Sequence, residues 1–315
     1  EIQEVDEWQL VVNSLRLDFN SDIYLTGSNA SILSGELSTY LAGRYVEIKV
    51  YPLSFQEFLD FKGDATFKNV QTYYHEYRKF GSFPSVVLQS DEKIKVDVLS
   101  GILDSILIRD VSLRDQKIDV PLLIKLTKYL FDIIGQIFSS KKVLGILKNE
   151  QLSSSFVTIN NYLSWLIRSF LFYKAERYDI RGKERLRTRG KYYTIDLGLR
   201  NQTLQDSEQN RGSQLENMVY LELLRRGYQV FVGKYDAKEI DFVARKRDEV
   251  IYFQVTAEIP RKSTRETDNL LYLPTGYAKK IIVENYNDVG TIEGIPVVHI
   301  LDFLLEGYEG KENLI

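Results

Sequence analysis

The stretch from residue 212 to residue 256 constrains the fold most, because helical and strand patterns alternate there around a few polar residues. An apolar pattern with helical spacing carries Glu216 near its start, and a strand pattern further on carries Asp241. A later strand pattern, over residues 251 to 256, places Gln254 and Thr256 two residues apart, where they share a face. The stretch therefore predicts an α/β unit that gathers four polar side chains.

These four residues suit part of the chemistry that a magnesium-dependent nuclease requires. Such a site needs hard oxygen ligands, which Glu216 and Asp241 would provide. It also needs a cation to stabilise the charge that develops on the phosphate. The last strand should supply an acidic residue and then a lysine, but Gln254 has only a neutral amide oxygen and Thr256 has no charge. Cleavage at this place is therefore not expected.

The spacing resembles the PD-(D/E)XK restriction-endonuclease-like fold with its last two positions lost. The resemblance implies a domain that keeps the nuclease fold without its activity, with Glu216 and Asp241 as the remaining metal ligands. Two other interpretations stay open, because Ser213-x-x-Glu216 is also typical of a capping box and Asp241 fits an ordinary strand-end carboxylate. Arg261 or Lys262, on the segment that follows, is an alternative source of the missing positive charge.

Composition restricts the partners and the compartment. A net charge of −3 and a pI of about 5.7 create no overall attraction for nucleic acid, so such binding needs a local basic patch. The sequence has no cysteine, which excludes disulfides and agrees with a cytoplasmic protein. The two histidines, His75 and His299, are expected to be structural or surface residues rather than zinc ligands. Neither a membrane span nor a secretory leader is expected.

Residues 1 to 62 have the pattern of an α/β domain. An amphipathic helix is expected soon after Glu1, and a short buried strand over residues 22 to 27. A helix through residues 32 to 41 and a strand over residues 45 to 51 follow. Ser54-x-x-Glu57 then predicts a capping box at the start of the next helix.

Four blocks in this region carry a closer resemblance: residues 1–5 (EIQEV), 25–30 (LTGSNA), 41–45 (LAGRY) and 52–58 (PLSFQEF). They resemble successive blocks of a bacterial and archaeal AAA-type ATPase family. Members of that family pair a P-loop domain with a C-terminal domain of unknown function that includes a restriction-endonuclease-like fold. The resemblance implies ATP and Mg²⁺ as ligands, and residues 196–201 (DLGLRN) match a linker block of the same family.

The resemblance also gives roles to single residues. Glu1 would orient the attacking water, Ser28 or Asn29 would sense the γ-phosphate, and Arg44 would stabilise the transferring phosphoryl group. The printed sequence contains no G-x-x-x-x-G-K-[ST] loop and no Walker B aspartate before Glu1, so ATP hydrolysis requires an N-terminal portion upstream of it. Arg44 also suggests a homo-oligomer. Alternatively, Ser28 and Asn29 form a simple strand-to-helix turn and Arg44 is a surface residue.

Residues 63 to 195 are expected to be mainly helical, with helices over residues 70–79, 91–110, 121–139, 140–151 and 154–173. The last two, with the hairpin that begins near residue 176, have the outline of a winged helix that contacts DNA. Four basic residues alternate in that hairpin, and on a strand they would line one face along a phosphate backbone: Lys183, Arg185, Arg187 and Arg189. The alternatives are an ordinary solvated face and a surface that docks a protein partner.

The sequence thus predicts an α/β protein of four parts: a partial P-loop AAA-type sheet (1–62), a helical region (63–139), a winged helix (140–195) and a restriction-endonuclease-like domain (196–315). In the last part, strands are expected over residues 280–283 and 297–301. The function expected is that of an AAA-type ATP-binding protein whose inactive nuclease-like domain serves binding or regulation. A metal-dependent nuclease that uses Glu216 and Asp241, and a noncatalytic DNA- or partner-binding module, are the alternatives.

Overall fold

The structure of the protein is a computed structural model. It describes residues 2, 5–27, 44–66, 68–111, 118–149, 154–205, 208–259, 265–274 and 276–308.

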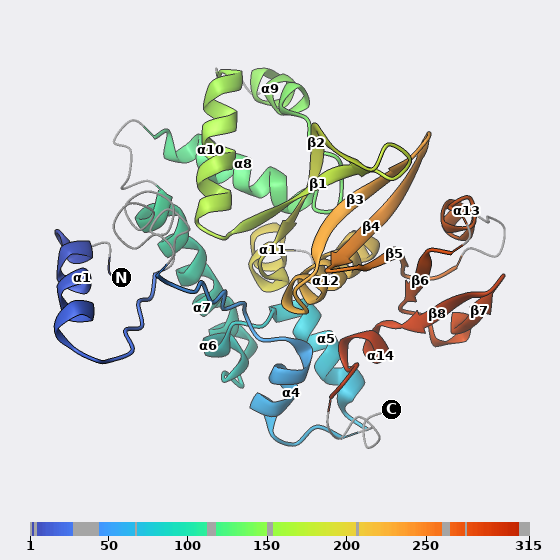
Figure 1. The fold of residues 1–315 in the computed structure, drawn as a ribbon, viewed down its shortest axis with the longest axis horizontal. Helices are drawn as coiled ribbons and strands as arrows, with labels where there is room; N and C mark the ends of the chain where they lie inside the picture. Colours follow the sequence, from blue (N-terminus) through green and yellow to red (C-terminus); the bar gives the residue numbers. More distant parts are fainter. Residues whose placement is uncertain are drawn as a thin grey trace.

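An eight-stranded mixed sheet organises the molecule (Figure 1). Its strands, in chain order, are β1 (Phe172–Asp179), β2 (Glu184–Thr194), β3 (Gln229–Tyr235), β4 (Lys238–Lys246), β5 (Glu249–Thr256), β6 (Ala278–Val283), β7 (Gly290–Ile292) and β8 (Ile295–His299). Across the sheet their order is β2-β1-β3-β4-β5-β6-β8-β7. The pairs β1–β3, β5–β6 and β6–β8 are parallel, and the other neighbours are antiparallel. The prediction of an α/β protein is confirmed.

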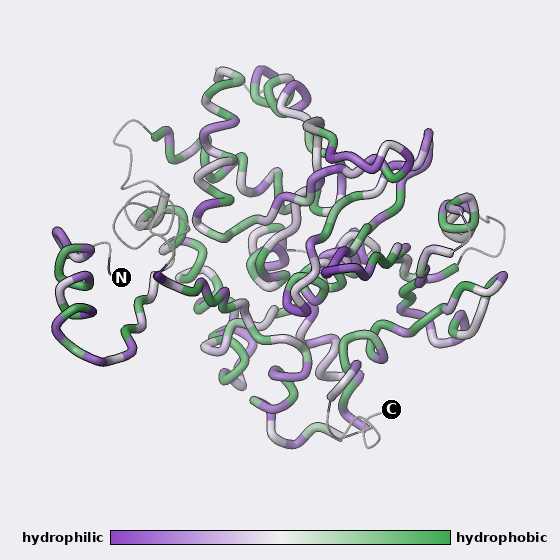
Figure 2. The backbone as a smooth tube through the Cα atoms, in the orientation of Figure 1, coloured by the Kyte–Doolittle hydropathy of each residue, from purple (hydrophilic) through white to green (hydrophobic). Residues whose placement is uncertain are grey.

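Helices cover the two faces of this sheet unequally. On one face, α12 (Arg211–Arg225), α14 (Ile300–Leu304), α4 (Phe55–Lys62) and α5 (Val70–Phe80) share a core with the inward residues of β3, β4 and β5. On the other face, α13 (Arg265–Leu271) contacts β4 and β5. Along the chain, hydrophobic residues gather in these packed elements, and the tip of the β3–β4 hairpin is hydrophilic (Figure 2).

A second core holds the helical region. It joins α7 (Glu92–Asp104), η2 (Ser105–Val111), α8 (Val120–Asp132), α9 (Ser140–Asn149), α10 (Phe156–Arg168) and α11 (Leu197–Leu204). Phe172 of β1 and Tyr192 of β2 belong to the same core, so the helices are packed onto one end of the sheet. The expected helices are present, but two end early. Helix α8 ends at Asp132 and α10 ends at Arg168. Shortly after each helix one residue has a positive φ, Gly135 (72°) and Phe170 (58°), and this backbone conformation does not continue an α-helix.

The hairpin expected as the wing of a winged helix is β1–β2, and it is part of the large sheet. β1 pairs in parallel with β3, so Arg177 faces Val232 across the strands. The sheet therefore crosses the boundary predicted between residues 195 and 196. The described residues form one mixed α/β sheet in which the hairpin and the predicted nuclease-like strands are continuous.

The N-terminal segment differs from the prediction. The helix after Glu1 is present as α1 (Trp8–Asp18), with Trp8 and Val12 buried. Residues 22–27 and 45–51, however, form no strand, so the described residues here contain no AAA-type sheet. Val46 and Val50 are 87% and 90% exposed. A strand needs a neighbour for its backbone hydrogen bonds, and no described residue pairs with either segment. The helix expected over residues 32–41 lies outside the described residues.

The capping box predicted before α4 is confirmed. The Ser54 hydroxyl accepts a hydrogen bond from the Glu57 backbone N–H (3.2 Å), and the Glu57 carboxylate accepts one from the Ser54 N–H (2.7 Å). Arg225 of α12 donates to the Pro52 and Leu53 carbonyls just before this helix (3.1 and 3.3 Å). The end of the N-terminal segment is thereby fixed to the helix that carries Glu216.

Candidate functional site

A buried lysine lies among three carboxylates at the centre of the candidate site. Lys191 Nζ is 3.2 Å from Glu216 Oε2, 3.0 Å from Glu239 Oε1 and 3.8 Å from Asp241 Oδ1. The Lys191 side chain is only 4% exposed. Three carboxylates from α12 and β4 therefore meet around one ammonium group from β2.

Glu216 is held by two donors from the same strand. Besides Lys191, the Tyr193 hydroxyl donates to Glu216 Oε2 over 3.1 Å. Lys191 and Tyr193 are two residues apart on β2, so their side chains leave the strand on one face. The alternative in which Ser213 and Glu216 form a capping box is wrong. Helix α12 begins at Arg211, its N-cap residue Asn210 makes no side-chain cap bond, and Glu216 faces the sheet instead.

A β-bulge directs Asp241 into the site. Phe231 pairs with Val243 and Gly233 pairs with Ile240, so β4 has one more residue than β3 between these pairs. The extra residue changes the alternation of side chains at Asp241, and bulges of this kind re-aim a side chain. Asp241 Oδ2 accepts a hydrogen bond from the Val255 N–H of β5 (2.9 Å). Asp241 is thus part of the sheet interior and not an ordinary strand-end carboxylate.

The loop after α8 closes the site from the other side. The Gly135 N–H donates to the Tyr192 carbonyl, and the Phe138 N–H donates to the Gly190 carbonyl, both over 3.1 Å. A Cβ at Gly135 would lie 3.0 Å from Glu216 Oε2. Gly190 allows the close approach of the strands, because a Cβ there would overlap the Ala175 carbonyl oxygen. The loop therefore fixes β2 at the point where Lys191 enters the cluster.

Burial and charge decide the protonation states. Burial disfavours the charged form of Lys191, but Glu216, Asp241 and Glu239 outweigh it and raise the Lys191 pKa. Burial raises the Glu216 pKa, and the charge of Glu239 adds to this effect. Lys191 and Tyr193 oppose the shift without cancelling it. Burial, together with the Glu216 and Asp241 charges, raises the Tyr193 pKa, so the phenol stays a donor. Lys191 is a permanent cation in this site.

The arrangement does not fit a divalent ion. Carboxylate oxygens are the ligands that Mg²⁺ prefers, but the ammonium of Lys191 stands within 3.8 Å of all three carboxylates. Among the residues that the structure describes, no group of three or more His, Cys, Asp or Glu side chains has the geometry to hold a metal ion. The positive charge that a metal would bring is already supplied by the lysine.

The two remaining predicted site residues both lie on β5. Gln254 is buried on β5, and its backbone pairs with Ile281 of β6. The Thr256 hydroxyl donates to the Glu258 carbonyl (2.8 Å), at the end of the same strand. Arg261 and Lys262, the alternative cations, lie outside the described residues. Of the predicted site residues, Glu216 and Asp241 lie together around Lys191.

Sequence reasoning missed Lys191, Glu239 and Tyr193. The available signals were local: Lys191 and Tyr193 alternate on a strand, and Glu239 precedes Asp241 by two residues. Nothing in those patterns says that β2 lies against α12. Only the contacts between β2, α12 and β4 in the folded chain show that the lysine of one segment faces the carboxylates of others.

Two members of the basic row predicted on the hairpin are described with their side chains. Lys183 lies in the turn before β2, with φ 54°, and Arg185 is exposed on the strand. Arg177 pairs with Leu186 and Ala175 pairs with Lys191, so β2 carries three extra residues between these pairs. The side chains of Arg187 and Arg189 lie outside the described residues, and DNA binding by the hairpin remains a prediction.

Of the residues expected to act on a nucleotide, the structure describes one. Arg44 is exposed at the start of the extended segment 44–50, and Glu1, Ser28 and Asn29 lie outside the described residues. Within the described part of the chain, no helix has the length and apolar character needed to cross a bilayer.

Comparison with known proteins places the chain in a class. Residues 1–59 match the AAA domain, and residues 71–210 match a domain of unknown function, DUF8612. An uncharacterized protein of Haemophilus influenzae is 50% identical over 307 residues, which are 97% of this chain and 76% of that protein. An uncharacterized protein of Methanocaldococcus jannaschii is 35% identical over 255 residues, 77% of this chain and 57% of that protein. No solved structure matches.

Over residues 1–59 the chain is similar to AAA-type ATPases. The chain belongs to the family that includes the Haemophilus influenzae protein, of which it covers more than two thirds.

Proposed function

We propose that this protein is an AAA-type ATP-binding protein whose C-terminal sheet is a noncatalytic, nuclease-like module for binding or regulation. The match to the AAA domain supports the first half of the proposal. The order α12, β3, β4, β5, α13, β6, with β6 parallel to β5, supports the nuclease-like part. That order is a helix, a three-stranded meander, a second helix and a parallel strand.

The observation that carries the noncatalytic role is the position of Lys191. Its ammonium lies 3.0 to 3.8 Å from the three carboxylates that a divalent ion would need. A metal could enter only by displacing a buried cation from its ion pairs, and the cost of leaving such a charge unpaired is several kcal/mol, about 3–5. Lys191 therefore holds the cluster as a structural centre.

Metal binding and DNA cleavage test this proposal together. The melting temperature of the wild-type protein should not rise with Mg²⁺ or Mn²⁺, and supercoiled and linear DNA should stay intact. Lys191→Met, which vacates the centre of the cluster, should gain a Mn²⁺-dependent rise in melting temperature. Metal-dependent cleavage by the wild type that is lost in Asp241→Asn would instead establish the alternative, an active nuclease that uses Glu216 and Asp241.

The nucleotide-binding half is tested through Arg44 in the full-length protein. If Arg44 stabilises the transferring phosphoryl group, Arg44→Ala should lower kcat for ATP hydrolysis by about 10³-fold or more and leave ATP affinity nearly unchanged. Lys49→Ala, an exposed cation of the same segment, is the matched control. An unchanged kcat for Arg44→Ala would contradict the assignment.

Mixing two inactive variants tests whether this arginine acts on a neighbouring copy. Glu1→Gln and Arg44→Ala should each be inactive, because Glu1 orients water and Arg44 stabilises charge. A mixture should recover part of the activity if one copy supplies Glu1 and its neighbour supplies Arg44. A mixture as inactive as its components would exclude an oligomeric site of this kind.

A further inference from the structure

One part of the sheet is open on the face opposite α12. Phe231 and Tyr178 belong to the core on that face, whereas Val230 and Val232 point to the α12 side. On this face, helix α13 contacts β4 and β5. An open cavity of about 360 Å³ lies over β1, β2 and β3. Five of its lining residues matter for its chemistry: Lys174, Glu176, Arg185, Gln229 and Phe231.

Two arginines lie over aromatic rings on this face. The Arg185 guanidinium is 4.9 Å from the centre of the Phe231 ring, and the Arg245 guanidinium is 5.5 Å from the centre of the Tyr178 ring. The two rings are themselves neighbours, with centroids 5.7 Å apart. Both rings are buried and both arginines are exposed. The two rings thus support two guanidinium groups that are exposed to solvent.

The cations of this face have no carboxylate partner in the part of the chain that the structure describes. No ion pair within 4.0 Å there involves Lys174, Arg185 or Arg245, and Arg185 donates a long hydrogen bond to Gln229 (3.4 Å). Arg181, in the nearby turn, differs because it pairs with Asp236 over 2.9 Å. Three exposed positive charges from β1, β2 and β4, beside the single carboxylate of Glu176 in the cavity lining, are therefore available to an anionic ligand.

We propose that this open face binds single-stranded nucleic acid. Unpaired bases stack on aromatic side chains and on arginine guanidinium planes, and cations beside them contact the phosphates. Arg185 and Arg245 combine both properties, because each presents a guanidinium held from below by a ring. Arg245 is not among the residues that line the cavity, so the positive charges extend beyond the cavity along the sheet. A duplex fits less well, since its bases are not free to stack on a flat sheet.

The test is fluorescence anisotropy of the full chain with labelled oligothymidylate of about twelve nucleotides, within the site sizes of such surfaces. Arg185→Ala with Arg245→Ala should weaken binding at least tenfold and reduce the salt slope by about 1.4, which is about 0.7 for each phosphate that is no longer neutralised. Arg185→Lys with Arg245→Lys keeps both charges but removes the planar groups, and this variant should have intermediate affinity. Each variant should keep the wild-type circular dichroism spectrum and melting temperature, since both side chains are exposed.

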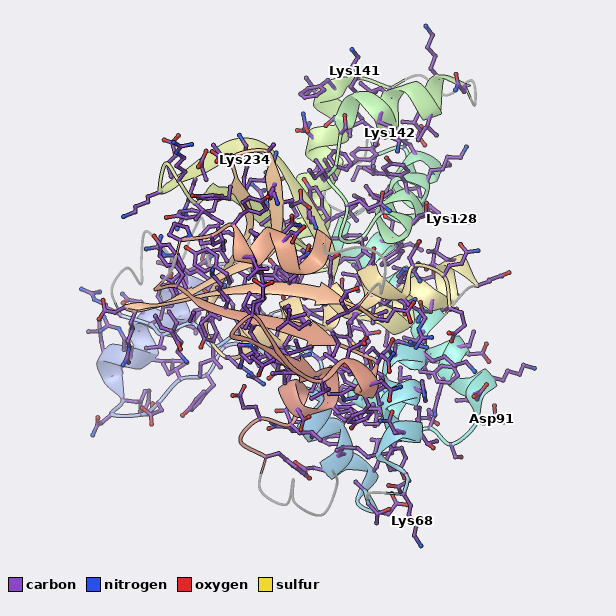
Figure 3. The ribbon with its side chains drawn as sticks, turned by 90° about the vertical axis from the view of Figure 1, so that its right-hand side faces the viewer. Lys68, Asp91, Lys128, Lys141, Lys142 and Lys234 are labelled. Carbon is purple, nitrogen blue, oxygen red and sulfur yellow. The ribbon has the colours of Figure 1, made fainter. Side chains whose placement is uncertain are left out.

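The matched control removes two positive charges elsewhere. Lys141 and Lys142 are exposed in the first turn of α9, within the predicted winged helix (Figure 3). Lys141→Ala with Lys142→Ala should bind the oligonucleotide like the wild type. Loss of binding in this control with retention in the arginine variant would overturn the proposal and favour the helical unit. Absence of binding by the wild type, or a preference for the corresponding duplex, would also overturn it.

Discussion

Lys191 on β2 and Glu216 on α12 form a buried ion pair, with Nζ and Oε2 3.2 Å apart. The pair joins the hairpin that precedes residue 195 to the helix that opens the predicted nuclease-like part. Glu239 and Asp241 of β4 add two further carboxylates to the same ammonium. The site therefore depends on elements from both sides of that boundary, and neither half contains it alone.

Lys191→Met should destabilise the fold strongly. Removing one partner of a buried ion pair leaves uncompensated charge, so the free energy of unfolding at pH 8 should fall by about 3–5 kcal/mol. Without the ammonium, Glu216 loses the cation that opposes the effect of burial, so its pKa in the folded state rises further. A raised folded pKa stabilises the protein at low pH, so the deficit should shrink as the pH falls toward about 5. Urea unfolding at several pH values measures both effects.

The matched variant for this prediction is Lys174→Met, which makes the same chemical change on the neighbouring strand β1. Lys174 is exposed and has no ion pair among the described residues, so its unfolding free energy should change by less than about 0.5 kcal/mol. Equal effects of the two substitutions, or a Lys191→Met deficit that does not depend on pH, would contradict the role given to the cluster.

Tyr193→Phe isolates one hydrogen bond of the site. The Tyr193 hydroxyl donates to Glu216 Oε2, and its loss leaves the ring packing and the Lys191 ion pair in place. We expect a loss of roughly 1–2 kcal/mol, since the acceptor is a buried carboxylate. Tyr192→Phe is the control, because the adjacent Tyr192 points to the other core and makes no side-chain hydrogen bond among the described residues. Similar losses in both variants would show that general packing, rather than the Glu216 contact, is being measured.

The extent to which sequence predicted this structure is clearest in two identical local patterns. Ser54-x-x-Glu57 and Ser213-x-x-Glu216 both predict a capping box, and only the first forms one. In the first pattern, Glu57 bonds to Ser54, three residues away. In the second, Glu216 instead accepts a hydrogen bond from Lys191, 25 residues distant in sequence. Local signals therefore recovered helices and most strands of the sheet. They could not give the packing of β2 against α12, which is a tertiary contact, or the bulge at Asp241, which depends on the register between β3 and β4.

The N-terminal segment shows that a local strand pattern alone does not produce a strand. The alternation over residues 45–51 is a sound strand signal, with Val46, Ile48 and Val50 at every second position. Those three side chains are nevertheless exposed, and no described strand pairs with them. A strand is a property of two segments, since its backbone donors and acceptors need partners. A local pattern records only one of the two.

Asp196→Asn should change how stability depends on pH. Asp196 is 2% exposed, and its carboxylate accepts hydrogen bonds from the Ser82 and Gly198 N–H groups (2.6 and 2.8 Å). Burial raises its pKa to about 6 despite these bonds. Because the folded pKa exceeds the ordinary value of about 3.9, its contribution is complete below pH 4 and is lost as the pH rises through about 6. The asparagine variant should lack this part of the pH profile.

The same variant should also be less stable at every pH. Its amide has one acceptor oxygen, so either Ser82 or Gly198 faces an N–H group instead of an acceptor, at a cost of about 1–3 kcal/mol. Asp179→Asn is the control, because Asp179 Oδ1 makes comparable bonds to the Arg181 and Gly182 N–H groups in an exposed turn. Denaturant unfolding between pH 4 and pH 8 distinguishes the two. A wild-type slope that survives in Asp196→Asn would assign it to another group.

A comparison of Gly81→Ala with Gly63→Ala separates the cost of backbone strain from the cost of overlap with the Asp196 side chain. Both glycines end a helix with φ 74°, α5 and α4 respectively. A Cβ at Gly63 meets no atom within 4 Å, so its replacement should cost only about 1 kcal/mol for the left-handed conformation. A Cβ at Gly81 would overlap the Asp196 carboxylate, which its backbone donors hold in place. We expect Gly81→Ala to cost roughly 3 kcal/mol or more, since overpacking adds to strain. The double variant Gly81→Ala with Asp196→Gly removes the overlapping group and should cost less than the sum of its two single changes, whereas strict additivity would show that the overlap contributes nothing.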